Sequence, residues 1–472
     1  MAITKIASPP AFSPAYNPLK FIYDGTNKNV DGFRYIFDVY PAGVATLLGR
    51  YPVFPSYSTG YGEIDISRLI GSLVSFDVPM VNTVSYTVPN SFYAYDVKIG
   101  EEYITTFPYT ASLTANGLNV KITCTHTFIV GDQVTITQAD GGVANPQLEG
   151  FFTVIAITGT TDFTVNALWA DVTVATIDGS VVYSDNRKTT NYAVVTSLAN
   201  VAFNGALSFQ DFIAYSSANY LLTANTDLLL TNIPQTGFWA TVDQDLYVNF
   251  GINSVSTGFV YFENSNGDIF KRTVLISAIL AGVPCGPDNT GTLTLVSGTA
   301  TLIKSDTTYY DFWYTNAGGT QHSVKYRVNI DTRCAIEDYS LIFQDRPGSF
   351  GSFAFQLRAY EKGSVSKQSF NKDIAGSVVS TEWGYETYDF GQSTYSSVVT
   401  KTLELNSNWM TEEMAEYFQE LITSPIVYLK SGSTYQAVTI TDSSFEVEKQ
   451  RNKSLIKKTV TIAYANQDTI NV

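Results

Sequence analysis

Histidines and cysteines are too few and too scattered in this sequence to form an evident catalytic or metal site. The 472 residues include two histidines, His126 and His322, and three cysteines, Cys124, Cys285 and Cys334. A Ser-His-Asp or Cys-His site would need one of those histidines, and neither lies in the strand-to-helix turn of a hydrolase nucleophile. No His/Cys cluster has zinc spacing. We therefore expect no catalytic residue, no metal and no cofactor, and we interpret the chain as a non-enzyme.

Two loops carry oxygen ligands of the kind that calcium prefers. They are Glu263–Asp268 (ENSNGD) and Asp288–Thr292 (DNTGT). Neither has the full calcium-loop pattern with its distal glutamate. Weak calcium binding at either loop stays an alternative to an ordinary hairpin turn.

An aromatic segment, residues 381–390 (TEWGYETYDF), offers the best sugar-contact pattern in the chain. Aromatic faces stack on sugar rings, and the candidate glycan contacts are Trp383, Tyr385 and Tyr388. The neighbouring acids could serve a glycoside hydrolase, which needs two carboxylates at a set separation; they are Glu382, Glu386 and Asp389. The alternative is an ordinary aromatic strand and loop.

The composition favours a chain whose surface is covered by partners. Charged residues make up only 15%, while there are 31 Tyr and 29 Phe. Tyrosine supplies much contact area at little entropic cost, although β-strands also favour these residues. The net charge of −15 argues against direct nucleic-acid binding.

Neither export nor membrane insertion is indicated. The first 20 residues have no apolar stretch of the secretory type, and no run approaches 18 apolar residues. The odd number of cysteines fits synthesis in a reducing cytosol. We expect no membrane span.

Strand patterns dominate the chain, so we predict an all-β fold. It would consist of tandem β-sandwich domains with an inserted small β-barrel and a C-terminal β-meander that carries one amphipathic helix. Short strands separated by Gly- and Asp-containing turns distinguish the barrel. The predicted parts are an extended proline-rich arm (1–20), a first sandwich (21–103 plus 184–200), the inserted barrel (104–183), a second sandwich (201–345) and a C-terminal domain (346–472).

The predicted helix spans residues 411–423. Thr411 is a good N-cap, Glu412 and Glu413 provide acids for the first turn, and Pro425 ends the helix. Apolar residues recur at spacings of three and four: Met410, Met414, Phe418, Leu421 and Ile422. We expect this stripe to pack on the C-terminal sheet.

Positive charge gathers around the last predicted hairpin, at Lys449, Arg451, Lys453, Lys457 and Lys458. Such charges either protect a strand edge from unwanted pairing or bind an acidic neighbouring subunit.

Two C-terminal segments, Asn408–Leu429 (NWMTEEMAEYFQELITSPIVYL) and Val438–Asn466, resemble tail-associated virion proteins of tailed phages that infect Bacteroidota-type hosts. The stretches FQDRPGSFGSFAF (343–355) and GYGEIDISRLI (60–70) are similar to the same group. Within the predicted barrel, Val130–Ile136 and Gly150–Val154 resemble small modules that decorate phage tail proteins. By that analogy the barrel would face outward.

The resemblance implies a structural subunit of the virion, most simply a tail, baseplate or distal-tail ring component made in the host cytoplasm. Its partners would be copies of itself in a ring and other virion proteins. A neck or portal-proximal ring protein is one alternative, and a tail-tip module that binds a host surface glycan is another. The candidate interface residues are Trp409, Phe418, Tyr428, Lys449, Arg451 and Lys453.

Overall fold

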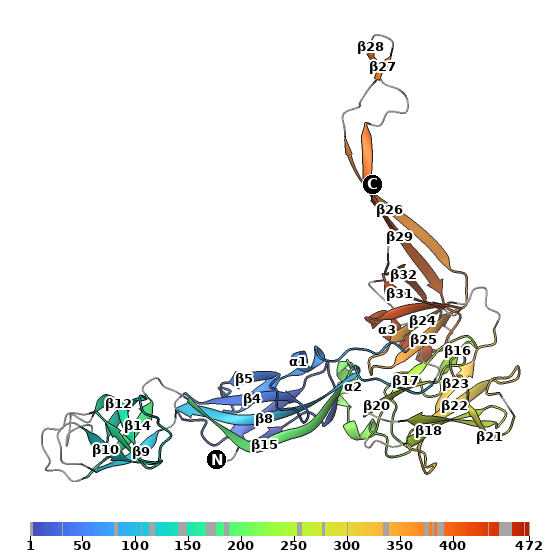
Figure 1. Ribbon diagram of the computed structural model, residues 1–472. Helices are drawn as coiled ribbons and strands as arrows, with labels where there is room; N and C mark the ends of the chain where they lie inside the picture. The colour runs from blue at the N-terminus through green and yellow to red at the C-terminus, as the bar shows by residue number, and fades with distance from the viewer. Residues whose placement is uncertain are drawn as a thin grey trace. The chain divides into compact units, whose positions relative to one another are not determined.

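The computed structural model consists mainly of β-strands, which confirms the predicted all-β class (Figure 1). The structure describes residues 3–30, 32–79, 84–104, 106–112, 119–139, 149–166, 176–183, 188–252, 257–275, 279–299, 301–333, 339–371, 377–379, 382–384, 391–432, 434–442, 456–466 and 468–471. The chain divides into two units. The first comprises residues 1–11, 18–67 and 94–201, and the second comprises residues 12–17, 68–93 and 202–472.

The first unit contains a β-sandwich. One sheet has the order β1-β3-β6, and the other contains the order β15-β8-β4-β5. The bounds are β1 (Ile3–Ala7), β3 (Lys20–Gly25), β4 (Arg34–Pro41), β5 (Gly49–Val53), β6 (Gly62–Asp65), β8 (Phe92–Ile104) and β15 (Lys188–Phe203). Tyr23 of β3 and Phe37 of β4 are fully buried, and their ring centroids lie 6.2 Å apart. The core therefore lies between the sheets.

A six-stranded barrel is inserted between β8 and β15, which are neighbours in the sandwich. Its closed order is β10-β13-β12-β11-β14-β9. The bounds are β9 (Phe107–Ser112), β10 (Val120–Thr123), β11 (Gln133–Gln138), β12 (Gly150–Ile157), β13 (Asp162–Val165) and β14 (Thr176–Tyr183). Alternate residues of β11 are buried, as a strand with one face toward the interior requires. Phe128 and Phe163 pack edge to face inside.

The second unit combines a six-stranded sheet with an eleven-stranded sheet. The six-stranded order is β16-β23-β22-β18-β19-β21. Its strands are β16 (Phe238–Ala240), β18 (Thr257–Asn264), β19 (Ile269–Leu275), β21 (Thr294–Ser297), β22 (Tyr309–Asn316) and β23 (Tyr326–Ile330). The turn between β18 and β19 uses Gly267 at φ 80°, a conformation that glycine adopts without strain.

The eleven-stranded sheet has the order β26-β29-β32-β31-β30-β24-β25-β17-β20-β7, with β33 paired to β29. Its strands are β7 (Tyr86–Thr87), β17 (Tyr247–Gly251), β20 (Leu280–Pro284), β24 (Tyr339–Gln344), β25 (Phe350–Phe355), β26 (Tyr360–Asn371), β29 (Gln392–Asn406), β30 (Val427–Ser431), β31 (Thr434–Ile440), β32 (Thr459–Tyr464) and β33 (Asp468–Asn471). One continuous core connects the two sheets.

Helix α3 (Glu412–Thr423) forms as predicted. The Thr411 side chain accepts a hydrogen bond from the Met414 N–H, and the apolar stripe is buried except for Ile422, which is partly buried. Tyr417 packs edge to face on Phe238 of β16, and Phe418 does so on Phe353 of β25. The helix thus packs against strands of both sheets. Among the described helices, none is long and apolar enough to cross a membrane.

The structure differs from the predicted N-terminal arm. Strand β1 pairs with β3, so residues 3–7 belong to a sheet of the first unit and are not a separate arm. Strand β2 (Phe12–Pro14) is buried, and the Phe12 ring stacks on Phe203 at 4.8 Å. Prolines prevent a helix here, but the aromatic and apolar residues between them have partners within the chain.

One predicted domain boundary also needs correction. The boundary predicted at residue 345 falls between β24 and β25, which pair with each other and share one core. Helix α2 (Phe209–Ile213) is capped by Ser208, and two of its apolar side chains are open to solvent. Phe209 is 79% exposed and Ile213 is 69% exposed.

Candidate functional site

A pocket of about 350 Å³ lies in the second unit, beside the start of α3. Four segments form its walls: β16, the residues that follow β23, β25, and the segment 407–411 that leads into the helix. Its apolar lining includes Phe353 and Met414, which are also core residues. The floor of the pocket is therefore continuous with the core of the second unit.

Arg333 joins two walls of this pocket. Its Nε and Nη2 donate to the two carboxylate oxygens of Asp331 at 2.8 and 2.6 Å, and Nη1 donates to the Trp409 carbonyl at 3.0 Å. The hydrogen bond with Asp331 raises the pKa of Arg333. The guanidinium and the carboxylate therefore form a charged pair with no net charge inside the pocket.

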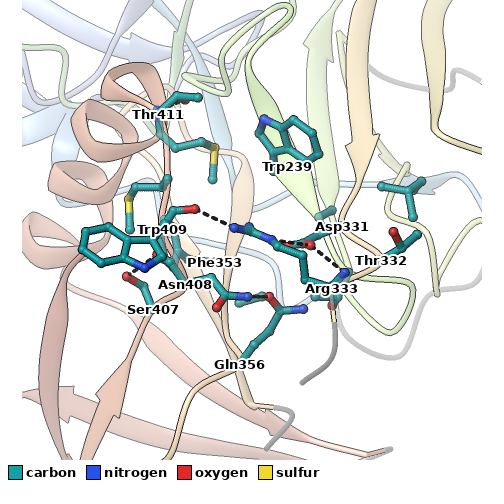
Figure 2. A pocket seen from close by; sticks show the side chains of 16 residues that line it. Trp239, Asp331, Thr332, Arg333, Phe353, Gln356, Ser407, Asn408, Trp409 and Thr411 are labelled. Carbon is teal, nitrogen blue, oxygen red and sulfur yellow. Dashed lines mark hydrogen bonds and ion pairs between the residues drawn. The ribbon is translucent and has the colours of Figure 1, made fainter. Parts of the chain in front are cut away.

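Two tryptophans stand on the rim. Trp239 is 41% exposed, and Trp409 is 53% exposed. Phe238 and Ala240 face the core, so the alternation of β16 directs Trp239 outward. Figure 2 shows both indoles around Arg333.

Neutral polar side chains complete the lining. Asn408 donates from its Nδ2 to Oε1 of the nearly buried Gln356. Ser407 donates to the Asn408 carbonyl at 2.9 Å and also accepts the Lys458 N–H at 2.9 Å. These bonds fix the segment that carries Trp409.

A second feature of this unit is the long hairpin formed by β26 and β29. The two strands pair from Tyr360 opposite Glu404 to Asn371 opposite Gln392. Strand β32 supports β29 only from Thr402 to Asn406, and β33 only from Ser396 to Val399. All twelve residues of β26 are exposed. We call these two strands the long hairpin.

The predicted interface residues fall in different environments. Trp409 is on the pocket rim, and Tyr428 is partly buried against a small core cluster that includes Ile342 and Phe350. Phe418 is only 3% exposed and packs in the chain's own core, so its side chain does not reach the surface. Lys449, Arg451 and Lys453 lie outside the described residues.

The predicted glycan patch is described only in part. Strand β28 (Glu382–Gly384) pairs with β27 (Ser377–Val379), which places Trp383 opposite Val378. Tyr385, Glu386, Tyr388 and Asp389 lie outside the described residues.

Both histidines have structural surroundings. His126 is buried in the barrel, where it stacks on Phe128, and its Nδ1 accepts the Phe128 N–H at 3.1 Å. The Nε2 of His322 lies 3.2 Å from Nδ2 of Asn316. Cys124 and Cys285 are buried, and burial raises the pKa of each thiol; Cys334 lies outside the described residues.

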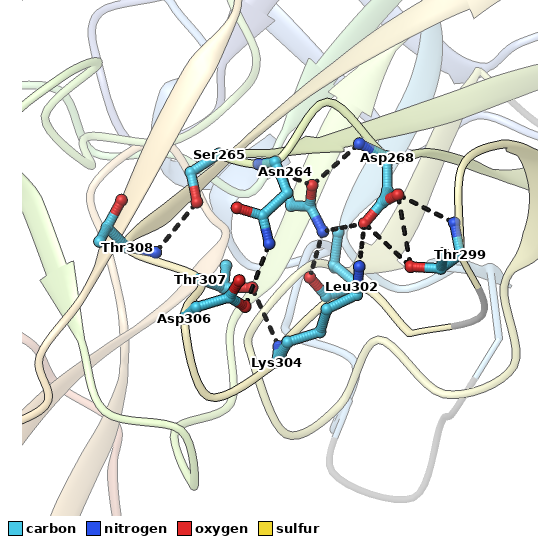
Figure 3. Close-up of polar contacts among 10 residues, drawn as sticks. Asn264, Ser265, Asp268, Thr299, Leu302, Lys304, Asp306, Thr307 and Thr308 are labelled. Carbon is cyan, nitrogen blue, oxygen red and sulfur yellow. Dashed lines mark hydrogen bonds and ion pairs between the residues drawn. The ribbon is translucent and has the colours of Figure 1, made fainter.

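In the first candidate calcium loop, groups of the protein itself already bond to the carboxylate of Asp268. Lys304 forms an ion pair with Asp268, Thr299 donates its N–H at 2.8 Å, and Asn264 donates at 3.0 Å (Figure 3). The bond from Lys304 lowers the pKa of Asp268 to about 2. An ammonium group thus holds the place where a cation would bind. In the second loop, Asp288 lies 2.6 Å from Lys430 Nζ.

Two acids, the buried Asp345 and the partly buried Glu420, line a larger pocket of about 760 Å³. Asp345 accepts bonds from the Thr231 hydroxyl and the Ser349 N–H at 2.8 and 2.7 Å. Glu420 accepts the Arg346 N–H at 3.0 Å. Burial raises the pKa of both acids, that of Asp345 to about 7. Their bonds hold the turn at residues 345–349 against α3.

Sequence reasoning missed Trp239, Asp331 and Arg333. The alternation in Phe238–Ala240 could have indicated an outward Trp239, but no motif associates it with Trp409. The fold alone brings these residues to one pocket.

Comparisons with known proteins do not assign a family. No family model matches the chain, and neither does any curated protein. The phage phi92 endosialidase is 9% identical with a TM-score of 0.15, covering 98% of this chain and 68% of that one. The native conformation of E. coli alpha-2-macroglobulin is 6% identical with a TM-score of 0.16, covering 100% of this chain and 34% of that one. Neither likeness is close enough to carry an argument.

Proposed function

We propose that the chain is a structural subunit of a tailed-phage virion, a tail, baseplate or distal-tail ring component without a catalytic role. It assembles with copies of itself and with other virion proteins through β-rich interfaces. The resemblance of its C-terminal third supports the virion assignment, and the long hairpin is the observation that supports assembly.

Among the residues that the structure describes, strand β26 pairs with β29 alone, and β29 has further strand neighbours along only part of its length. Ordering a residue costs about 1–2 kcal/mol, and isolated two-stranded hairpins are marginal in water. Strand β26 nevertheless exposes apolar side chains, with Val365 54% and Phe370 49% accessible. Burial of these side chains by a neighbouring molecule would supply the missing stabilisation.

The outer edge of β26 is also suited to strand addition. It is the terminal strand of its sheet, so one row of backbone groups faces away from β29. Three of its twelve residues are charged, namely Glu361, Lys362 and Lys367, and Lys362 pairs with Glu404 of β29. Glu361 also pairs with Lys401 of β29, so two of the three charges are engaged within the hairpin, and the open backbone edge is a template for pairing with another strand.

The test is a comparison of molar mass by light scattering. The full chain should form a defined oligomer, and V365D/F370D should reduce it to monomer because the added carboxylates would be buried at the interface. The matched control V44D/F54D changes the same residue types at sites 50% and 70% exposed in the first unit, and should leave the oligomer intact.

A chain that stays monomeric at high concentration, or V365D/F370D with unchanged mass, would overturn assembly through the long hairpin. The virion assignment has its own test. Mass spectrometry of purified particles should find the chain at a fixed ratio to other tail proteins, and its absence from particles would refute the assignment.

A further inference from the structure

We propose that the pocket between Trp239 and Trp409 binds a neutral sugar ring, as a terminal residue of a glycan. This inference does not rest on the assembly proposed above. It also differs in place from the aromatic segment at residues 381–390.

The lining of the pocket combines apolar and polar surfaces, as a sugar ring does. A sugar ring presents apolar C–H faces and a rim of hydroxyl groups. The pocket offers two half-exposed indoles together with Asn, Gln, Ser and Thr side chains. A few oriented polar groups in a largely apolar pocket are typical of small-ligand sites, and about 350 Å³ is at the small end of their range.

The exposure of the two tryptophans is the second argument. The chain has five tryptophans, and two of them, Trp239 and Trp409, line this one pocket. An indole exposed to water is costly, and a ligand that covers both rings would recover that energy. Trp313, by contrast, stacks on Tyr261 within its own sheet and lies under Lys325.

The charge of the pocket selects a neutral ligand. Asp331 holds the Arg333 guanidinium with two hydrogen bonds, and the Asp331 side chain is only 8% exposed. An anionic ligand would have to compete with this carboxylate for the guanidinium, and a cationic ligand would meet the guanidinium itself. Three of the five guanidinium N–H groups of Arg333 bond to Asp331 and the Trp409 carbonyl, and the others can donate to sugar hydroxyls.

The bonds around Trp409 fix its position before a ligand arrives. Arg333 holds the Trp409 carbonyl, and Met410 pairs with Ile456 through backbone bonds of 2.9 and 3.0 Å. Trp239 is fixed by the parallel pairing of β16 with β23. Because the rim is already ordered, binding of a ligand costs little conformational entropy.

The test uses the full chain and methyl glycosides of glucose, galactose, mannose and N-acetylglucosamine. Tryptophan fluorescence reports binding directly, and saturation-transfer NMR shows whether the sugar C–H protons contact protein. At least one glycoside should bind saturably, and W239A and W409A should each weaken binding at least tenfold. W409F should retain part of the affinity because a flat apolar ring remains.

The matched control is F209A, which removes an aromatic side chain that is 79% exposed outside the pocket. It should leave binding unchanged, and thermal melting should show that all variants are folded. The proposal fails if no glycoside binds, or if W239A and W409A bind as the unmodified chain does. It also fails if only anionic N-acetylneuraminic acid or only a proline-rich peptide binds. If the chain is a monomer and binds sugar, assembly through the long hairpin is refuted and sugar binding in the pocket is supported.

Discussion

Replacing Lys430 by methionine tests whether a buried charge network stabilises the second unit. Lys430 lies in β30, and its Nζ is 3.0 Å from Asp245 Oδ1, 2.6 Å from Asp288 Oδ2 and 2.7 Å from the Asp243 carbonyl. The side chains of Lys430 and Asp245 are 5% and 1% exposed. Methionine keeps the apolar stem but removes the ammonium group, so Asp245 would remain buried without its cation.

The expected loss is large because Asp245 cannot be reached by water. Breaking a buried pair typically costs about 3–5 kcal/mol. Losing the contact with Asp288 adds less to the loss of stability, since the Asp288 side chain is 50% exposed and solvent can replace the lysine. We therefore expect Lys430→Met to lower the free energy of unfolding by about 3–5 kcal/mol at pH 8.

The loss should shrink as the pH falls. Burial already raises the pKa of Asp245 above its ordinary value, and removing the ammonium should raise it further. With a folded pKa above the unfolded one, the folded state binds the proton more tightly. The variant should therefore regain stability between pH 8 and pH 5, as Asp245 becomes neutral.

Lys325→Met is the matched control. Lys325 lies 2.9 Å from Glu263, but the two side chains are 43% and 36% exposed. It also lies 4.0 Å from the centroid of the Trp313 ring. Exposed contacts of this kind are worth about 1 kcal/mol or less, so this variant should change stability little, with a small dependence on pH.

Urea unfolding followed by tryptophan fluorescence is the assay, because four of the five tryptophans belong to the second unit. With a slope of about 3 kcal/mol/M, the expected loss would move the midpoint by about 1–1.7 M. Equal losses in the two variants, or a loss in Lys430→Met that is the same at pH 8 and pH 5, would refute the reasoning.

Three further substitutions, with Phe209→Ala as the control for the first, test the packing, the cap and the buried acid. Phe418→Ala should cost about 3–5 kcal/mol by leaving a cavity beneath α3, whereas Phe209→Ala should stay within about 0.5 kcal/mol; comparable urea midpoints would contradict the burial of Phe418. Thr411→Ala should cost about 0.5–2 kcal/mol through loss of the α3 cap, measured in the same way, and no change would mean that the cap is dispensable. Burial raises the pKa of Asp345 to about 7, above the unfolded value of about 3.9, so stability should fall as the pH rises from 4 to 7. Asp345→Asn cannot ionise and should flatten that fall in thermal melts, and an unchanged pH profile would exclude Asp345 as its source.

The class of fold and the one long helix could be predicted because both rest on local patterns. The cap at Thr411, the acids after it and the stop at Pro425 lie within fifteen residues of one another in the sequence. Strand alternation is equally local, and it also distinguishes the barrel. These signals need no knowledge of which strand pairs with which.

The domain boundary and the pocket depend on pairing between distant strands. A boundary at residue 345 looks reasonable in sequence because a proline and a glycine follow, yet Asp345–Ser349 is a tight turn between two paired strands. Phe418 belongs to the predicted apolar stripe, and that stripe faces the core. The exposed α2 shows the opposite case, in which apolar spacing alone did not indicate burial.

The order of strands in the large sheet has a consequence for synthesis. Strand β7 at residues 86–87 shares that sheet with β32 at residues 459–464. The residues of the first unit are all synthesised by residue 201, but those of the second continue to residue 472. At about 5–20 residues per second, the ribosome needs roughly 15–55 s to make that last stretch. During this interval strands such as β24 wait for partners that are made later, in this case β30, so a bound chaperone should raise the yield of soluble chain and slower translation should lower it.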